Sequence, residues 1–282
     1  MNIMFVSLAA CALCAGGVLS AQEAEAPRAA PVDRFAAIAS LETTVRKADG
    51  AVDAVYRSRL VEPSTEALAK AGGRLPLVVF LHGSGERGDD NTAQLKHFAG
   101  ATAGEEFQSR VPAFVLAMQC PRDESWSAID LKAFREKGEL PRFAEEPTRA
   151  MRALVAAIEE VLATKPVDRD RVYLTGLSMG GFGAFDLAAR RPELFAAIAP
   201  ICGGGDPTTA ARFAHLPLAI VHGADDPVVP VALSRAMRDA AVAAGGSPRF
   251  LELAGIGHDA WTPAYRFGTD GILDWMFAQR RN

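Results

Sequence analysis

Residues 171–185 read RVYLTGLSMGGFGAF, and this stretch decides the fold that we expect. Its first part, Val172–Thr175, is a short run of β-branched and aromatic side chains, which is typical of a buried strand. The pentapeptide 176–180, GLSMG, follows and matches the pattern G-x-S-x-G. The Ala-rich residues after it predict a helix up to Arg191, where Pro192 would end it. A strand, a sharp turn with a serine and a helix together predict a nucleophile elbow.

The two glycines of the pentapeptide have a physical explanation in such a turn. Ser178 must adopt a strained backbone conformation that pushes its hydroxyl above the sheet. A side chain at Gly176 or Gly180 would collide with the neighbouring strand or helix, so glycine is needed at both positions. The helix that begins here directs its positive end at the serine and at any anion beside it. The alternative, a Gly-rich turn with an incidental serine, leaves the flanking strand and helix unexplained.

Length and composition are those of a globular protein with one sizeable core. The chain has 282 residues, of which 49% are hydrophobic and 23% charged, and its formal net charge is −4. After removal of a leader, about 250 residues fit a single α/β domain. The sequence contains no block of basic residues, so we expect no nucleic-acid partner and no polybasic contact with a membrane.

The N-terminal 21 residues predict a secretory signal peptide that is cleaved near Ala21. Residues 3–19 are apolar and uncharged, and a polar stretch follows, although no Lys or Arg precedes the apolar run. We therefore expect a secreted or periplasmic protein. A lipoprotein anchored at Cys11 is the less favoured alternative, and a stable membrane contact is expected only in that case. Residues 22–40 are rich in Ala, Glu and Pro at their start and predict a flexible spacer.

Strands alternate with helices through residues 41–282, which predicts one α/β domain with a mostly parallel sheet and helices on both faces. The expected strands are residues 41–47 and 52–61, which form a hairpin, and then 75–81, 113–118, 172–175, 195–201, 217–221 and 249–253. The expected helices are residues 147–164, the stretch after the elbow, 231–244 and 271–280. Residues 123–146 have no clear period and predict a lid or pocket wall.

Polar residues follow several of these strands directly, namely Ser84, Ser178, Asp226 and His258. They should therefore share one edge of the sheet. A serine hydroxyl needs a base, usually histidine, to take its proton, and a carboxylate orients that base. In α/β-hydrolases the chain order is Ser, then Asp or Glu, then His. Here His258 follows the last strand in a Gly-rich turn, and we predict it as the base. His215 precedes a strand and so lies at the wrong edge, whereas His222 is predicted to be a structural histidine under its loop.

Two adjacent aspartates compete to be the acid. Asp225 and Asp226 follow the strand at residues 217–221, and adjacent side chains point in different directions, so only one can face His258. We predict Asp226, because Pro227 stiffens the backbone behind it, and we interpret Asp225 as a loop-capping residue. Weaker candidates are Asp206 and Asp259.

An oxyanion hole needs two backbone N–H donors aimed at the developing negative charge. One is expected from Met179, directly after the nucleophile, and the other from Ser84, with Gly85 as the alternative. Trp126 is predicted to line the substrate pocket, with a core position as an equally good interpretation, and Trp261 is a weaker candidate of the same kind. We find no metal-ligand spacing and no phosphate-binding loop, so neither a metal nor a cofactor is expected.

Four segments together resemble the bacterial exported α/β-hydrolases described as phospholipase/carboxylesterase-like, dienelactone-hydrolase-like or prolyl-oligopeptidase-like. They are LPLVVFLHGSGERGDDN at 75–91, RVYLTGLSMGGFGAFDLAARRPELFAAIAPICGGG at 171–205, VHGADDPVVP at 221–230 and GIGHDAW at 255–261. The resemblance extends from about residue 52 to the C-terminus. It implies an α/β-hydrolase fold with Ser178, Asp226 and His258 as a catalytic triad, and it supports Asp226 over Asp225.

The strand order of that family also bears on the two cysteines outside the predicted leader. Cys120 would end the fourth strand and Cys202 the sixth, with two strands between them in the sheet. At about 4.8 Å per strand the two residues would lie about 14 Å apart, which is too far for a disulfide. The resemblance therefore implies two unpaired, buried thiols near the active-site edge.

The function that we predict is a serine esterase that acts on a small-molecule ester. Ser178 would attack the ester carbonyl, and His258 would take its proton and pass it to the leaving alcohol before water releases the acyl group. A serine peptidase with the same triad is the first alternative. A non-catalytic binding protein on the same scaffold is the second. The sequence predicts neither the acyl and alcohol groups nor the oligomeric state.

Overall fold

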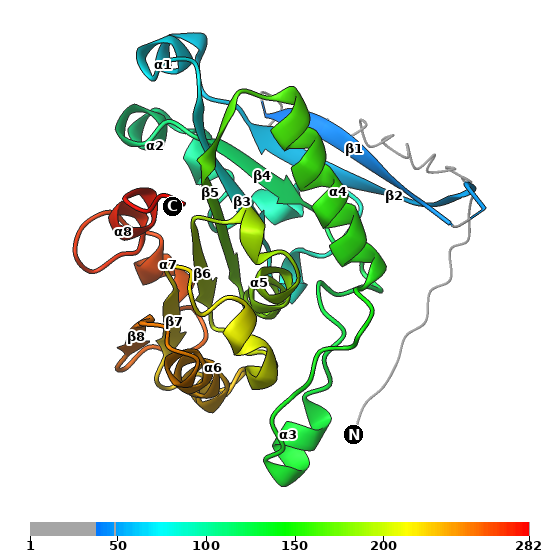
Figure 1. Ribbon diagram of the computed structural model, residues 1–282, viewed down its shortest axis with the longest axis vertical. Coiled ribbons are helices and arrows are strands. Elements are labelled where there is room, and N and C mark those ends of the chain that lie inside the picture. The colour runs from blue at the N-terminus through cyan, green and yellow to red at the C-terminus, as the bar shows by residue number, and fades with distance from the viewer. Residues whose placement is uncertain (1–37, 48, 282) are drawn as a thin grey trace, which may run out of the picture. The chain divides into compact units, whose positions relative to one another are not determined.

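The computed structural model describes residues 38–47 and 49–281 (Figure 1). The strands are β1 Ala39–Arg46, β2 Val52–Val61, β3 Leu75–Leu81, β4 Phe114–Met118, β5 Val167–Leu177, β6 Ala197–Ile201, β7 Ala219–Gly223 and β8 Arg249–Leu253. The helices are α1 Thr65–Lys70, α2 Glu105–Arg110, α3 Lys132–Lys137, α4 Arg149–Thr164, α5 Met179–Arg190, α6 Val231–Ala243, α7 Trp261–Ala264 and α8 Leu273–Phe277. Short 3₁₀ helices lie at Ser84–Glu86, Ala93–Leu95, Ala101–Ala103, Pro192–Leu194 and Pro207–Arg212.

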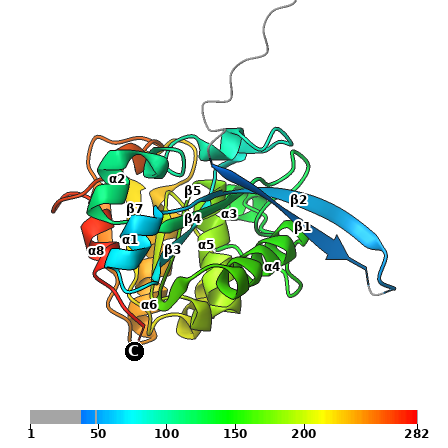
Figure 2. The ribbon, with the colours of Figure 1, turned by 90° about the horizontal axis from the view of Figure 1, so that it is seen from above.

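The described strands form one sheet in the order β1-β2-β4-β3-β5-β6-β7-β8. β2 pairs antiparallel with both β1 and β4, and every other neighbouring pair is parallel. This confirms the predicted α/β-hydrolase fold with a mostly parallel sheet. Figure 2 shows the β1–β2 hairpin projecting past α4.

The central strand β3 explains why its sequence is apolar at every position. Leu77 and Val79 pack into the core that also contains side chains of α4 and α5. Val78 and Phe80 pack into the core that contains side chains of α2 and α8. Successive side chains of a strand point to opposite faces, so a strand covered on both faces must be apolar throughout. The turn directly after β3 is therefore carried on a rigid support.

Of the segments predicted at the N-terminus, the structure describes only the last three residues of the predicted spacer, 38–40. The predicted signal peptide, residues 1–21, lies outside the described residues, as does the predicted spacer up to residue 37. Strand β1 begins at Ala39, two residues before the boundary that we expected. No helix among the described residues combines the length and the apolar character needed to cross a membrane.

Most expected elements are present with shifted ends. α4 begins at Arg149, where the Thr148 side chain accepts a hydrogen bond from the N–H of Met151 and caps the helix. The closing helix α8 is only five residues long. Beyond its end, the N–H of Arg281 donates to the carbonyl of Asp170. Three helices were not predicted, α1, α2 and α7, and α3 lies inside the segment expected to be irregular.

The two cysteines in the described residues are unpaired and buried. Cys120 follows β4 and Cys202 follows β6, and the sheet order places β3 and β5 between those strands. The separation implied by the family's strand order is therefore confirmed.

Candidate active site

Ser178 occupies the turn between β5 and α5. Its backbone has φ 53° and ψ −118°, a conformation that residues other than glycine rarely adopt. The N–H of Ser178 donates to the carbonyl of Ile201 at 2.9 Å, and its own carbonyl accepts the N–H of Gly181 at 2.8 Å. Hydrogen bonds to β6 and to the first turn of α5 therefore hold the strained residue in place.

The glycines around Ser178 are required by close packing of backbone. A Cβ at Gly176 would lie 2.4 Å from the carbonyl oxygen of Gly180. A Cβ at Gly180 would lie 2.0 Å from the carbonyl oxygen of Leu81, at the end of β3. Both distances are well below van der Waals contact, so the elbow and the loop after β3 pack together only because these positions lack side chains.

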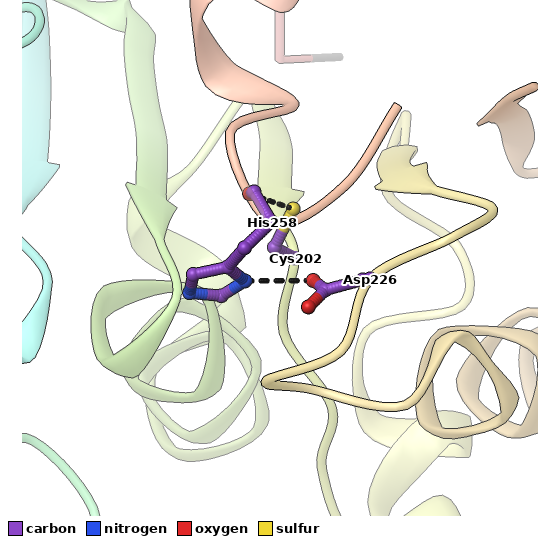
Figure 3. Close-up of side chains that lie close together, drawn as sticks. All are labelled: Cys202, Asp226 and His258. Atoms are coloured by element: carbon purple, nitrogen blue, oxygen red, sulfur yellow. Dashed lines mark hydrogen bonds and ion pairs between the residues drawn. The ribbon is translucent and has the colours of Figure 1, made fainter. Parts of the chain in front are cut away.

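His258 lies between Ser178 and Asp226. Its Nε2 is 3.0 Å from the hydroxyl oxygen of Ser178, and its Nδ1 is 2.7 Å from Oδ2 of Asp226. Figure 3 shows His258, in the turn after β8, facing Asp226, in the loop after β7. With the Nδ1–H donated to the carboxylate, the lone pair of Nε2 is directed at the serine hydroxyl. This arrangement lets the imidazole accept the serine proton.

Asp226 is held as an ionised, oriented carboxylate. Its side chain is fully buried, and Oδ1 accepts the backbone N–H groups of Val228 at 2.8 Å and Val229 at 3.0 Å. Burial acts to raise the pKa of the Asp226 carboxyl, but the hydrogen bonds from His258 and from this backbone outweigh it and hold the pKa below its usual value. Asp225, by contrast, is exposed and contributes its backbone N–H to the carbonyl of Ile256.

His222 is a second histidine in contact with Asp226. Its Nε2 is 3.2 Å from Oδ2 of Asp226 and 2.9 Å from the carbonyl of Val229, and its Nδ1 is 2.7 Å from the hydroxyl of Ser234. The ring is completely buried, and burial lowers its pKa. His222 therefore supports the loop that carries Asp226, as a structural histidine would, whereas His215 is exposed ahead of β7.

The turn after β3, which carries Ser84, is braced by a buried histidine. His82 donates Nδ1–H to the carbonyl of Gly83 at 2.7 Å, and its Nε2 accepts the backbone N–H of Cys120, two residues after β4, at 2.9 Å. Burial lowers the pKa of His82 to about 4, so the ring is neutral near pH 7 and keeps one donor and one acceptor nitrogen.

Ser84 and Met179 lie on the two backbone segments that meet at the elbow. Ser84 opens the 3₁₀ helix after β3, and Met179 is the first residue of α5. Within the described part of the chain, the backbone N–H groups of these two residues have no intramolecular acceptor. An oxyanion hole requires two such uncommitted donors, and Met179 directly follows Ser178.

The prediction that Trp126 lines the substrate pocket does not hold in the structure. Its side chain is completely buried, its Nε1–H donates to the carbonyl of His82 at 3.0 Å, and a Cβ at Gly183 would lie 2.5 Å from its own Cβ. A ring with no exposed surface offers nothing to a substrate. The structure thus favours the other interpretation of Trp126, a core aromatic, which here fixes the backbone of the turn after β3.

Trp261 is an aromatic residue that lies directly against His258. Its ring meets the ring of His258 edge-on, with centroids 5.2 Å apart. Its Nε1–H donates to Nδ1 of His97 at 3.2 Å, and Nε2 of His97 is 3.3 Å from Oε1 of Glu86, in the turn after β3. The sequence indicated Trp261 as a weaker candidate for the site, but nothing in it pointed to His97, which links Trp261 to Glu86.

An apolar cluster flanks the triad on another side. Phe182 lies one helical turn after Ser178, and it packs with Val229 and Leu233 against part of the 123–146 segment. The residues of that segment in the cluster are Ile129, Leu131 and Phe134. The segment is anchored by Asp206, whose carboxylate accepts Arg142 Nη1 at 3.0 Å and the N–H of Phe143 at 3.3 Å. Asp206 therefore holds the 123–146 segment in place and is not the acid that orients His258.

One group in the described residues has the donor atoms of a metal site. A sulfur of Cys202, a carboxylate oxygen of Asp226 and a ring nitrogen of His258 all lie within 4.8 Å of one another. Asp226 already receives hydrogen bonds from two backbone N–H groups and from His258. We therefore interpret the group as part of the triad and its support, and we assign no metal to it.

Comparisons with known proteins identify the family of this chain. The family model described as phospholipase/carboxylesterase matches residues 64–267. A protein of Nocardia uniformis subsp. tsuyamanensis, named "Putative esterase NocK", is 27% identical over 212 residues, which cover 73% of this chain and 56% of that protein.

Solved structures show the same fold. A thermostable esterase superposes with a TM-score of 0.72 at 35% identity, covering 86% of this chain and 63% of that one. An acylaminoacyl peptidase of Pyrococcus horikoshii has a TM-score of 0.53 at 15% identity and covers 79% of this chain and 37% of that one, so it shows the fold alone. This chain spans less than two thirds of each of these three proteins. The family model covers most of the chain, and the protein therefore belongs to the phospholipase/carboxylesterase family of α/β-hydrolases.

Proposed function

We propose that this protein is a carboxylic ester hydrolase that works through an acyl-enzyme on Ser178. The observation that carries the proposal is the continuous line from Ser178 through His258 to Asp226, with separations of 3.0 and 2.7 Å. The similarity to the thermostable esterase and to NocK supports the same chemistry. The substrate is a small-molecule ester, and no cofactor is needed for the reaction.

The proposed reaction has two halves. Ser178 Oγ attacks the ester carbonyl while His258 Nε2 takes its proton, and the buried Asp226 carboxylate stabilises the imidazolium that forms. The N–H groups of Ser84 and Met179 bind the oxyanion, and His258 then protonates the leaving alcohol. Water repeats the sequence on the acyl-enzyme, which frees the acid and restores the serine.

The surroundings of the triad favour an apolar group on the substrate. Phe182, Val229 and Leu233 are almost fully buried, and the partly exposed Ile129, Leu131 and Phe134 pack against them to form an apolar wall. On the other side, Trp261 packs against His258, the group that protonates the leaving alcohol. We infer that the apolar wall binds the acyl part and that Trp261 faces the alcohol.

Hydrolysis of p-nitrophenyl acetate, butyrate and octanoate, beside methyl ferulate and an aminoacyl anilide, tests the proposal. Wild type should cleave the esters, and Ser178→Ala should reduce turnover by at least about 10³-fold. Cleavage of the anilide with negligible ester turnover would replace the proposal with a peptidase. Reaction with neither class, together with no labelling by a fluorophosphonate, would indicate a binding protein on this scaffold.

We also propose that the protein is exported, on the basis of the apolar stretch at residues 3–19 followed by polar residues. Mass spectrometry of the protein expressed with its N-terminus intact tests this. A mature protein that begins near residue 22 is expected, and a chain that keeps its N-terminal residues in the cytoplasm would contradict it.

A further inference from the structure

Three consecutive residues at the end of β6 reach all three members of the triad. The carbonyl of Ile201 accepts the N–H of Ser178 at 2.9 Å, which fixes the nucleophile. The sulfur of Cys202 lies 3.1 Å from the carbonyl oxygen of His258. The next residue, Gly203, is connected to Asp226, the third member of the triad, through a path of other side chains.

That path runs through two buried polar side chains. The carbonyl of Gly203 accepts the hydroxyl of Ser234 at 2.8 Å, and this hydroxyl is 2.7 Å from Nδ1 of His222. His222 in turn lies 3.2 Å from the carboxylate of Asp226. Of the three connections, only the one made by Cys202 uses a side chain of the β6 segment itself, so it can be removed by substitution.

The position of Cys202 is fixed by its backbone conformation, a backbone hydrogen bond and burial. Its φ is 47°, in the left-handed region that residues other than glycine rarely occupy. Its N–H donates to the carbonyl of Val221 at 2.9 Å, and its side chain is fully buried. Burial raises the pKa of the thiol to about 12, so the sulfur keeps its proton and can donate it.

The carbonyl that Cys202 contacts belongs to the segment between β8 and α7. His258 follows the turn at residues 254–257, in which Gly255 has φ 72°. Its carbonyl also accepts the N–H of Ala260, two residues along, which is a local bond. Among the contacts of the described residues, the one from Cys202 connects this carbonyl to the segment that directly follows β6. Figure 3 shows the sulfur of Cys202 beside the backbone carbonyl of His258, close to the line from His258 to Asp226.

We propose that Cys202 is a positioning residue for the catalytic histidine. Its S–H holds the backbone of His258 and thereby keeps the ring in line with both Asp226 and Ser178. This inference rests on the proposed function, because it gives a role to a residue in support of that triad.

The test compares Cys202→Ala and Cys202→Ser with Cys120→Ala, which removes the other buried thiol. Three quantities are measured: kcat and KM for p-nitrophenyl acetate, the rate constant for labelling by a fluorophosphonate, and the melting temperature. Loss of one hydrogen bond that orients the base should lower kcat of Cys202→Ala about tenfold with KM unchanged. The labelling rate should fall by the same factor.

The serine and the control separate positioning from stability. A hydroxyl can replace the S–H donor, so kcat of Cys202→Ser should return to within about threefold of wild type. Cys120→Ala should lower the melting temperature and leave kcat and the labelling rate unchanged. If Cys202→Ala does not fold, Cys202→Gly takes its place, because glycine lacks the thiol and tolerates the positive φ without strain.

Two results would overturn the inference. One is a thiol-free variant, Ala or Gly at position 202, that keeps wild-type kcat and labelling rate. The other is a loss of kcat in Cys120→Ala as large as that in Cys202→Ala. A wild-type protein that neither turns over esters nor reacts with the fluorophosphonate would overturn the proposed function as well. A reactive wild type with an equally reactive Cys202→Ala would overturn only the role of Cys202.

Discussion

Substitution of Gly180 by alanine should disable the active site through the loop after β3. The added Cβ would lie 2.0 Å from the carbonyl oxygen of Leu81, and real Cβ atoms keep at least 3.0 Å from such an atom, so α5 and that loop must separate by 3.0 − 2.0 = 1.0 Å. Ser84 lies three residues beyond Leu81, and its N–H would move with the loop. A misplacement of this size typically costs about 10²-fold in rate.

The effect on stability has two opposing parts. Overpacking of a rigid contact costs about 1–3 kcal/mol, whereas alanine in place of glycine inside a helix gains up to about 1 kcal/mol. A net loss of about 1–2 kcal/mol corresponds to a melting temperature lower by roughly 2–8 °C for a domain of this size. At room temperature the variant therefore stays folded, and the loss of rate measures geometry.

The assay is kcat on p-nitrophenyl acetate together with calorimetric melting, and the matched control is Gly85→Ala. Gly85 lies in the same loop as Ser84, but no atom is within 4 Å of its added Cβ. The control should keep kcat within about threefold of wild type. Wild-type kcat and melting temperature in Gly180→Ala would refute the steric account of the elbow.

Three further predictions follow from single side chains. Asp226→Asn should lower kcat by about 10³–10⁴-fold while wild-type folding is retained, and a decrease below tenfold in steady-state kinetics would show that another residue orients the histidine. His82 has a folded pKa of about 4, below the unfolded value, so its contribution to stability is complete above about pH 6.5 and is lost as the pH falls toward 4. Urea unfolding should show wild-type stability falling across this range by up to about 3 kcal/mol more than that of His82→Gln, and equal pH slopes would contradict it. Asp206→Ala should free the anchored end of the 123–146 segment, with amide exchange there at least about tenfold faster and exchange in β3 unchanged; unchanged exchange throughout would mean that other contacts hold the segment.

The elbow and the order of catalytic groups were predictable because their signals are local. The pentapeptide 176–180 needs its glycines for contacts that any strand-turn-helix of this kind creates. The apolar run of β3 reports burial on both faces, and its predicted bounds are those of the structure. Asp226 was favoured over Asp225 by local backbone stiffness, and the structure brings Asp226 to His258 and leaves Asp225 exposed.

Contacts between distant parts of the chain could not be predicted in the same way. Cys202 and His258 are 56 residues apart, and nothing in either segment indicates their contact. For Trp126 the sequence left a pocket position and a core position equally open, because a loop tryptophan looks the same in sequence whether it is buried or exposed. Helices α1 and α2 have six residues each, fewer than two turns, which is too short for an apolar period to show.

Labelling of the wild-type protein with a fluorophosphonate, followed by peptide mapping and an assay of residual ester hydrolysis, tests the central claim most directly. We predict one adduct per chain, on Ser178, with ester turnover lost in proportion to the labelled fraction and no labelling of Ser178→Ala. An adduct on another residue, or full turnover by a completely labelled protein, would contradict the assignment of Ser178 as the nucleophile.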